Sequence, residues 1–117
     1  MEEFVLLYRG AECTFSAYDP TLTAAEIAAR KDRAKAWFEK LAEEGSLKSY
    51  GYPLQQVGKH VAGNGVIMDG PFTEGKELIG GFSIIVAKDL DDATRIAQTC
   101  SVLEFGGSVE VRPIAAM

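Results

Sequence analysis

The residues best suited to chemistry lie in the segment 68–82, where Asp69-Gly70-Pro71 separates two apolar runs. Asp69 directly follows the apolar residues Val66, Ile67 and Met68, so its carboxylate is expected at the end of a strand, where a sheet interior opens to solvent. A carboxylate in that position can act as an acid or a base. Asp before Gly-Pro is also common turn chemistry, in which the carboxylate accepts hydrogen bonds from following amides. Both readings of Asp69 stay open.

Two arginines are candidates for binding an anionic ligand. Arg9 ends the first apolar run, and Arg112 lies in the last one. If the strands that carry them are neighbours, both guanidiniums can line one cleft with Asp69 and bind a small anionic molecule. The alternative is that they form partly exposed ion pairs with Glu110 or Asp69, which contribute little.

The first half of the chain predicts a strand followed by a helix. Residues 3–9 carry large apolar groups on both faces, which is typical of a central strand. Thr23 and Glu26 have the spacing of a capping box, so a helix is expected to begin there and to end at Gly45. Its apolar stripe is formed by Ile27, Ala34, Trp37, Phe38 and Leu41. The charged residues of this helix lie mostly outside the stripe: Glu26, Arg30, Lys31, Arg33, Glu39, Lys40 and Glu43.

The second half predicts a hairpin, a strand, a helix and a final strand. Residues 47–57 and 66–68 are interpreted as the two arms of a long hairpin around the turn at 63–65, with Pro53 at an edge or a bend. Residues 82–87 form a second central strand, and Asp89 caps the following helix. Residues 108–114 alternate, with Val109 and Val111 directed inward.

This order of elements predicts a single domain over residues 1–117 with a ferredoxin-like α+β sandwich, an antiparallel sheet with two helices on one face. Two helices cover only one face of the sheet. The central strands are apolar on both faces, so Val5, Leu7 and Ile85 are expected to face water in a monomer. We therefore predict a homodimer that packs sheet against sheet.

The motifs Asp69-Gly70-Pro71-Phe72 and 103–114 (LEFGGSVEVRPI) closely resemble the DGPF branch of the YCII-related family, over nearly the whole chain. The resemblance implies a dimeric α/β barrel. Asp69 matches the acid of the naming motif, and Glu74 matches an acidic position of the family loop, which makes Glu74 a secondary ligand-binding candidate. Some relatives are proposed to use a His–Asp couple, but the first helix here carries no histidine, and His60 lies elsewhere.

Composition narrows the class of protein. With 117 residues, 47% hydrophobic and 25% charged, the chain fits one globular domain, and no apolar run approaches the ~20 residues of a membrane span. The start at Met1 lacks the features of a signal peptide, so a cytoplasmic location is expected. The net charge of -5 and the dispersed basic residues argue against direct binding of nucleic acid.

Metal and nucleotide cofactors are not predicted. Cys13 and Cys100 lie outside any CxxC or Cys/His cluster, and we interpret both as structural, with a disulfide between them left open. No P-loop or G-x-G-x-x-G fingerprint follows a strand, and Gly80-Gly81 indicates either positive φ or a close approach of another backbone or ligand. Four aromatic residues are interpreted as core and interface packing: Tyr8, Trp37, Tyr50 and Tyr52.

Two functions follow as hypotheses. The first is a small-molecule-binding protein or enzyme that uses Asp69 in an acidic cleft of a dimeric α/β barrel, with proton transfer or isomerisation of a small anionic or cyclic metabolite as the reaction. The alternative rests on the family resemblance, since DGPF-type domains resemble partners of extracytoplasmic-function sigma factors. It predicts a regulatory or interaction protein whose acidic surface suits a basic partner.

Overall fold

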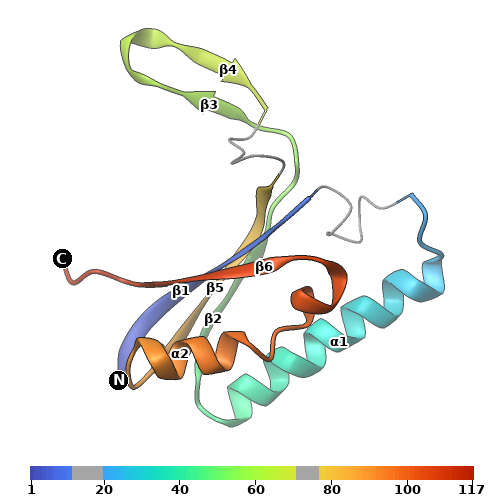
Figure 1. Cartoon of the computed structure of the whole chain (residues 1–117), viewed down its shortest axis with the longest axis vertical. Helices are drawn as coiled ribbons and strands as arrows, with labels where there is room; N and C mark the ends of the chain where they lie inside the picture. Colours follow the sequence, from blue (N-terminus) through green and yellow to red (C-terminus); the bar gives the residue numbers. More distant parts are fainter. Residues whose placement is uncertain (12–19, 71–76) are drawn as a thin grey trace.

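Two antiparallel sheets and two α-helices make up the structure, a computed structural model that describes residues 1–11, 20–70 and 77–117 (Figure 1). The elements in chain order are β1 (Glu2–Gly10), α1 (Ala24–Glu43), β2 (Leu47–Pro53), β3 (Lys59–Val61), η3 (Gly63–Gly65), β4 (Ile67–Asp69), β5 (Leu78–Ala87), α2 (Leu90–Ala97), η4 (Ser101–Phe105) and β6 (Ser108–Pro113), where η marks a short 3₁₀ helix.

The main sheet has the strand order β2-β5-β1-β6, with every neighbouring pair antiparallel. The predicted α+β fold with a ferredoxin-like order is therefore confirmed, including the adjacency of the first and last strands. Both α-helices lie on the same side of this sheet (Figure 1). No helix or strand of the described residues covers the other face of the sheet.

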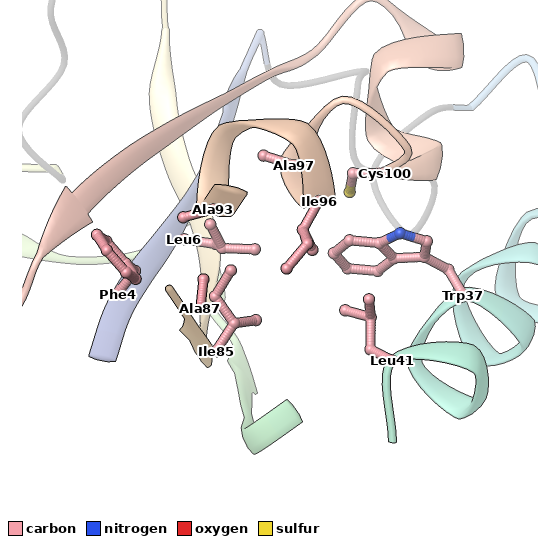
Figure 2. Close-up of a cluster of buried hydrophobic side chains, with 10 residues drawn as sticks. All are labelled: Phe4, Leu6, Trp37, Leu41, Ile85, Ala87, Ala93, Ile96, Ala97 and Cys100. Carbon is pink, nitrogen blue, oxygen red and sulfur yellow. The ribbon is translucent and has the colours of Figure 1, made fainter. Parts of the chain in front are cut away.

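The hydrophobic core lies between the inner face of the sheet and the two helices (Figure 2). Phe4 and Leu6 of β1 are fully buried, and the register Phe4↔Ile85 places Ile85 on the same face. Trp37 and Leu41 of α1 close the core from the helix side. The expectation that Ile85 faces water was wrong, because it is 0% exposed within this core.

The outer face of the sheet carries Val5 opposite Ile84, and Leu7 opposite Glu110. Val5, Leu7 and Ile84 are each half-buried in the single chain. Residues 82–87 are apolar at nearly every position, so alternation alone does not reveal which set points inward. Ile84 takes the outer place that the sequence had suggested for Ile85.

The predicted long hairpin divides into two parts. β2 pairs with β5 at the edge of the main sheet, whereas β3 and β4 form a separate two-stranded ladder with the register His60↔Met68. We call the ladder of β3 and β4 the hairpin arm, and it projects beyond the main sheet (Figure 1). β2 ends at Pro53, which has no amide hydrogen to donate, and the amide of the next residue, Leu54, donates to the carbonyl oxygen of Gly80 at 2.8 Å.

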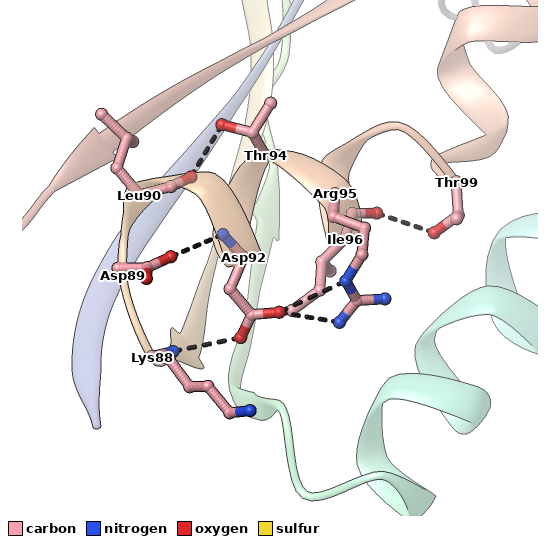
Figure 3. Close-up of polar contacts among 8 residues, drawn as sticks. All are labelled: Lys88, Asp89, Leu90, Asp92, Thr94, Arg95, Ile96 and Thr99. Carbon is pink, nitrogen blue, oxygen red and sulfur yellow. Dashed lines mark hydrogen bonds and ion pairs between the residues drawn. The ribbon is translucent and has the colours of Figure 1, made fainter.

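Both α-helices begin at the residues that the sequence indicated. Thr23 and Glu26 form a complete capping box at the start of α1, with side chain to backbone distances of 3.1 and 3.2 Å. Asp89 caps α2 by accepting from the amide of Asp92 at 2.8 Å, and the Asp92 carboxylate accepts from Lys88 and Arg95 (Figure 3). No helix in the described part of the chain has the length and apolar character needed to cross a membrane.

Candidate functional site

A cavity of about 700 Å³ lies between α1, η4 and the inner face of β1, β2 and β5. We call it the α1 cavity. Its wall contains Tyr8, Arg30, Lys31, Ala34, Trp37, Phe38, Tyr50, Tyr52, Pro53, Leu54, Gln55, Gly80, Gly81, Phe82, Ser83, Cys100, Ser101, Val102 and Phe105. Its volume falls within the range of small-molecule sites, and its wall is mainly apolar and aromatic with a few polar groups.

A chain of two hydrogen bonds lies on the sheet side of the α1 cavity. The Tyr8 hydroxyl donates to Ser83 Oγ at 2.8 Å, and Ser83 Oγ donates to the carbonyl oxygen of Tyr50 at 2.8 Å. Ser83 is fully buried, so these bonds satisfy a hydroxyl that would otherwise be costly to bury. The Tyr8 oxygen keeps acceptor capacity that a ligand in the cavity can use.

This arrangement does not activate a nucleophile. The proton of Ser83 Oγ goes to a backbone carbonyl, which is not a base, and Ser83 accepts only from a phenol. Burial raises the pKa of the Tyr8 phenol well above its usual value, and the hydrogen bond to Ser83 only partly offsets this. Tyr8 therefore stays protonated at neutral pH and serves as a hydrogen-bonding group.

The helix side of the α1 cavity is aromatic. Trp37 and Phe38 lie with ring centroids 5.0 Å apart, and Phe38 contacts Tyr50 at 5.5 Å, both pairs tilted by about 60°. Trp37 is held in place because its Nε1 donates to Thr99 Oγ1 at 2.8 Å, and Thr99 Oγ1 in turn donates to the carbonyl of Ile96. Figure 3 shows this last bond beyond the end of α2. The indole is thus fixed before any ligand enters.

Two glycines allow β2 to approach β5 beside this cavity. Gly51 has φ of 65°, and a Cβ there would lie 1.8 Å from the carbonyl oxygen of Phe82. A Cβ on Gly81 would lie 3.0 Å from the carbonyl oxygen of Tyr52. Of the two reasons predicted for Gly80-Gly81, the close approach of another backbone is the one found at Gly81.

Cys100 lies in the wall of the α1 cavity as a buried free thiol. Burial raises the pKa of this thiol to about 11. At neutral pH it is therefore a neutral, weakly polar group, and its thiolate is scarce. Cys13 lies outside the described residues, and the described part of the chain contains no group of three His, Cys, Asp or Glu side chains placed to hold a metal ion.

Asp69 lies at the end of β4, on the hairpin arm, and not in the wall of the α1 cavity. Its side chain is 92% exposed, and its Oδ1 lies 2.7 Å from Nζ of Lys59 on β3. The carboxylate is therefore solvated and paired across the two strands. In the single chain the described contact of Asp69 is an exposed ion pair, which contributes little, and the turn that follows Gly70 lies outside the described residues.

Arg9 and Arg112 lie together on the outer face of the sheet. Both line a smaller cavity of about 190 Å³, in which Nη1 of Arg9 is 2.8 Å and Nε of Arg112 is 3.9 Å from the Glu110 carboxylate. Glu77 also contacts Arg9, at 3.8 Å. Two carboxylates thus accompany the two guanidiniums, and Asp69 is absent from this wall as well. Glu74 lies outside the described residues.

Tyr8, Ser83 and Arg30 were not predicted from the sequence to bind a ligand, although signals for such a role exist. Arg30 lies four residues before Ala34 and seven before Trp37, which places it on the same face of α1. Tyr8 and Ser83 are the polar members of the inward positions of β1 and β5. A polar atom at such a position indicates either a satisfied core group or the wall of a cavity, and here it is both.

The antiparallel ferredoxin-like sheet with two helices on one face defines an α+β domain. The YCII-related domain matches residues 13–117, so the chain belongs to the YCII-related family. An uncharacterised protein of Rhizobium meliloti strain 1021 is 45% identical over 58 residues, which is 49% of this chain and 47% of that protein. The matched stretch therefore spans about half the length of that relative.

Proposed function

We propose that this protein binds a small organic molecule in the α1 cavity. The observation that carries the proposal is the cavity itself, about 700 Å³ in volume and lined by aromatic side chains with a few convergent polar groups. Such a combination is the usual form of a ligand site. The rigid position of Trp37 and the hydrogen-bonded Tyr8 mean that little order has to be created when the ligand binds.

The polar groups of the cavity favour binding and orientation over covalent chemistry. Tyr8 supplies a neutral phenol oxygen, and Ser83 is committed to its own hydrogen bonds. Proton transfer or isomerisation by Asp69 stays a prediction that requires a ligand at the hairpin arm. The arm and the α1 cavity are thus alternative locations for the ligand, and mutations can separate them.

The test is a thermal-shift and calorimetric screen of small cyclic and carboxylated compounds against three proteins. Ala34→Phe fills the cavity from the helix side, whereas Asp69→Asn changes only an exposed carboxylate. We expect compounds that bind the wild type to bind Asp69→Asn equally and to bind Ala34→Phe at least about tenfold more weakly. Loss of binding in Asp69→Asn with full binding in Ala34→Phe contradicts the proposal. Circular dichroism checks that Ala34→Phe is folded.

The second candidate is an interaction function, favoured by apolar groups outside the core. Val61, Ile67 and Met68 on the hairpin arm are 68%, 62% and 50% exposed. Val5 and Leu7 lie on the uncovered face of the sheet. We propose a second copy of the chain as the partner for this face, which keeps the predicted homodimer. A regulatory partner such as a sigma factor stays a prediction.

Sedimentation velocity tests this second candidate. The wild type is expected to sediment as a dimer and Leu7→Lys as a monomer, because a buried lysine at the centre of the sheet interface leaves an unpaired charge. Ile67→Lys on the hairpin arm is the matched control and is expected to stay dimeric. A monomeric wild type at tens of micromolar would reject the sheet-face dimer.

A further inference from the structure

In the wall of the α1 cavity, one nitrogen of the Arg30 guanidinium has no hydrogen-bond acceptor among the described residues. The guanidinium carbon lies 4.2 Å from the centre of the Phe105 ring, so the cation stacks on an aromatic face that also lines the cavity. Its Nη1 is buried, and no described residue accepts a hydrogen bond from it. A buried charged donor without an acceptor is costly, which gives the site a reason to bind one.

Other arginines described in the chain are paired with carboxylates. Arg33, one turn of α1 away, lies 2.8 Å from Glu104, and Arg95 lies 2.8 Å from Asp92. Arg9 lies between Glu110 and Glu77. Arg33 also lies over the Phe105 ring, at 5.9 Å, so Arg30 differs from these three by its closer stacking at 4.2 Å and by an Nη1 without an acceptor among the described residues.

The charge of the cavity wall is opposite to that of the whole protein. The chain has a net charge of -5, yet the described lining of the α1 cavity contains Arg30 and Lys31 and no Asp or Glu. A negatively charged ligand therefore meets two cations and no carboxylate at this wall. The rest of the lining favours flat apolar groups, because Trp37, Phe38 and Tyr50 present aromatic faces and edges.

We infer that the ligand of the α1 cavity is an aromatic or other flat cyclic carboxylate, with its carboxylate on Arg30 and its ring against the aromatic wall. This inference rests on the proposed function and names the ligand class for the same site. A carboxylate bound there supplies the acceptor that Nη1 of Arg30 lacks among the described residues. The Tyr8 oxygen then remains available to a hydroxyl or amino group on the ring.

Calorimetry with matched pairs of compounds tests the inference. Three pairs differ only in the charge of one group: benzoate and benzamide, 2-naphthoate and 2-naphthamide, indole-3-acetate and indole-3-acetamide. For the pair that fits the cavity best, we expect the wild type to bind the carboxylate at least about tenfold more tightly than the amide. For benzoate and benzamide, changes in the fluorescence of Trp37, the single tryptophan of the chain, also report binding within the cavity.

Two arginine variants make the test specific. Arg30→Gln is expected to remove the preference for the carboxylate and to keep the affinity for the amide, whereas Arg33→Gln keeps the preference, because Arg33 is already paired with Glu104. Equal affinities in the wild type, or a preference that survives in Arg30→Gln, overturn the carboxylate inference and leave the proposed function standing if the amides bind. Failure of all six compounds to bind contradicts both.

Discussion

The α1 cavity and the hairpin arm differ in nearly every property that makes a site. The cavity is walled by ordered aromatic rings and a buried hydrogen-bonded serine, whereas Asp69 on the arm is 92% exposed and paired with Lys59. The arm carries Asp69, the acid of the motif that stands out in the sequence, whereas Ser83 and Arg30 of the cavity wall were not predicted to bind a ligand. In the single chain, Asp69 and the cavity lie in different places.

The two regions also differ in how much a single polar contact contributes to stability. Ser83 and Nη1 of Arg30 in the cavity wall are buried, so hydrogen bonds to such groups are strong and unpaired donors are costly. Groups on the arm are surrounded by water, where ion pairs contribute little. Substitutions of similar size should therefore change the free energy of unfolding more at buried positions near the cavity than on the arm.

Leu6→Ala is expected to lower the free energy of unfolding by about 2–5 kcal/mol, because Leu6 is fully buried under the helices and its loss leaves a cavity. Ile67→Ala on the arm is the matched control, and a change within about 0.5 kcal/mol is expected since Ile67 is 62% exposed. Urea denaturation measures both. A cost for Ile67→Ala as large as that for Leu6→Ala would mean that the arm is covered by another chain.

Cys100 is expected to make the wild type less stable between pH 9 and 11. The unfolded thiol ionises near pH 9, whereas burial raises the folded pKa to about 11, so above pH 9 the unfolded state binds fewer protons and stability falls. The loss is at most about 2–3 kcal/mol for a shift of two pKa units. Denaturation of the wild type and Cys100→Ala at pH 8 and pH 11 measures it. Parallel losses in the two proteins would rule out this role for Cys100.

Tyr8→Phe is expected to lower the free energy of unfolding by about 1 kcal/mol, because it removes one hydrogen bond to the buried Ser83 and leaves the bond from Ser83 to Tyr50 intact. Tyr52→Phe is the control, since the Tyr52 side chain is largely exposed. Equal effects of the two substitutions in denaturant titrations would place Tyr8 outside the buried network.

The ion pair of Lys59 and Asp69 is expected to have the smallest effect. Both side chains are mostly exposed, so a double-mutant cycle with Lys59→Met and Asp69→Asn should give a coupling energy of about 0–1 kcal/mol that decreases in 1 M salt. A coupling well above this range, insensitive to salt, would show that the pair is desolvated in the assembled protein.

Local signals in the sequence were sufficient to predict much of the fold. Thr23 with Glu26, and Asp89, determine where the two helices begin, because capping depends only on nearby residues. The order of elements was sufficient to predict that β1 and β6 are neighbours in the sheet. Strand pairing at longer range was harder to predict, since β2 pairs with β5 and the turn at 63–65 belongs to the separate arm.

The site was less predictable than the fold for a physical reason. Whether Arg30 is solvated or stacked depends on Phe105, which is 75 residues away in the sequence. The exposure of Asp69 likewise depends on how the arm leaves the sheet. Residue types and spacing identified Asp69, Arg9 and Arg112 as charged groups near strand ends, and only the packing distinguishes paired surface charges from the wall of a cavity.

The most direct test of ligand binding in the α1 cavity is a crystal structure of the protein soaked with a library of small cyclic carboxylates and their amides. We expect ordered ligand density between α1 and the sheet, in contact with Trp37 and Phe38. The carboxylate groups are expected within hydrogen-bond distance of Arg30. Ligand density confined to the surroundings of Asp69, with the α1 cavity empty in the same crystals, would contradict the account.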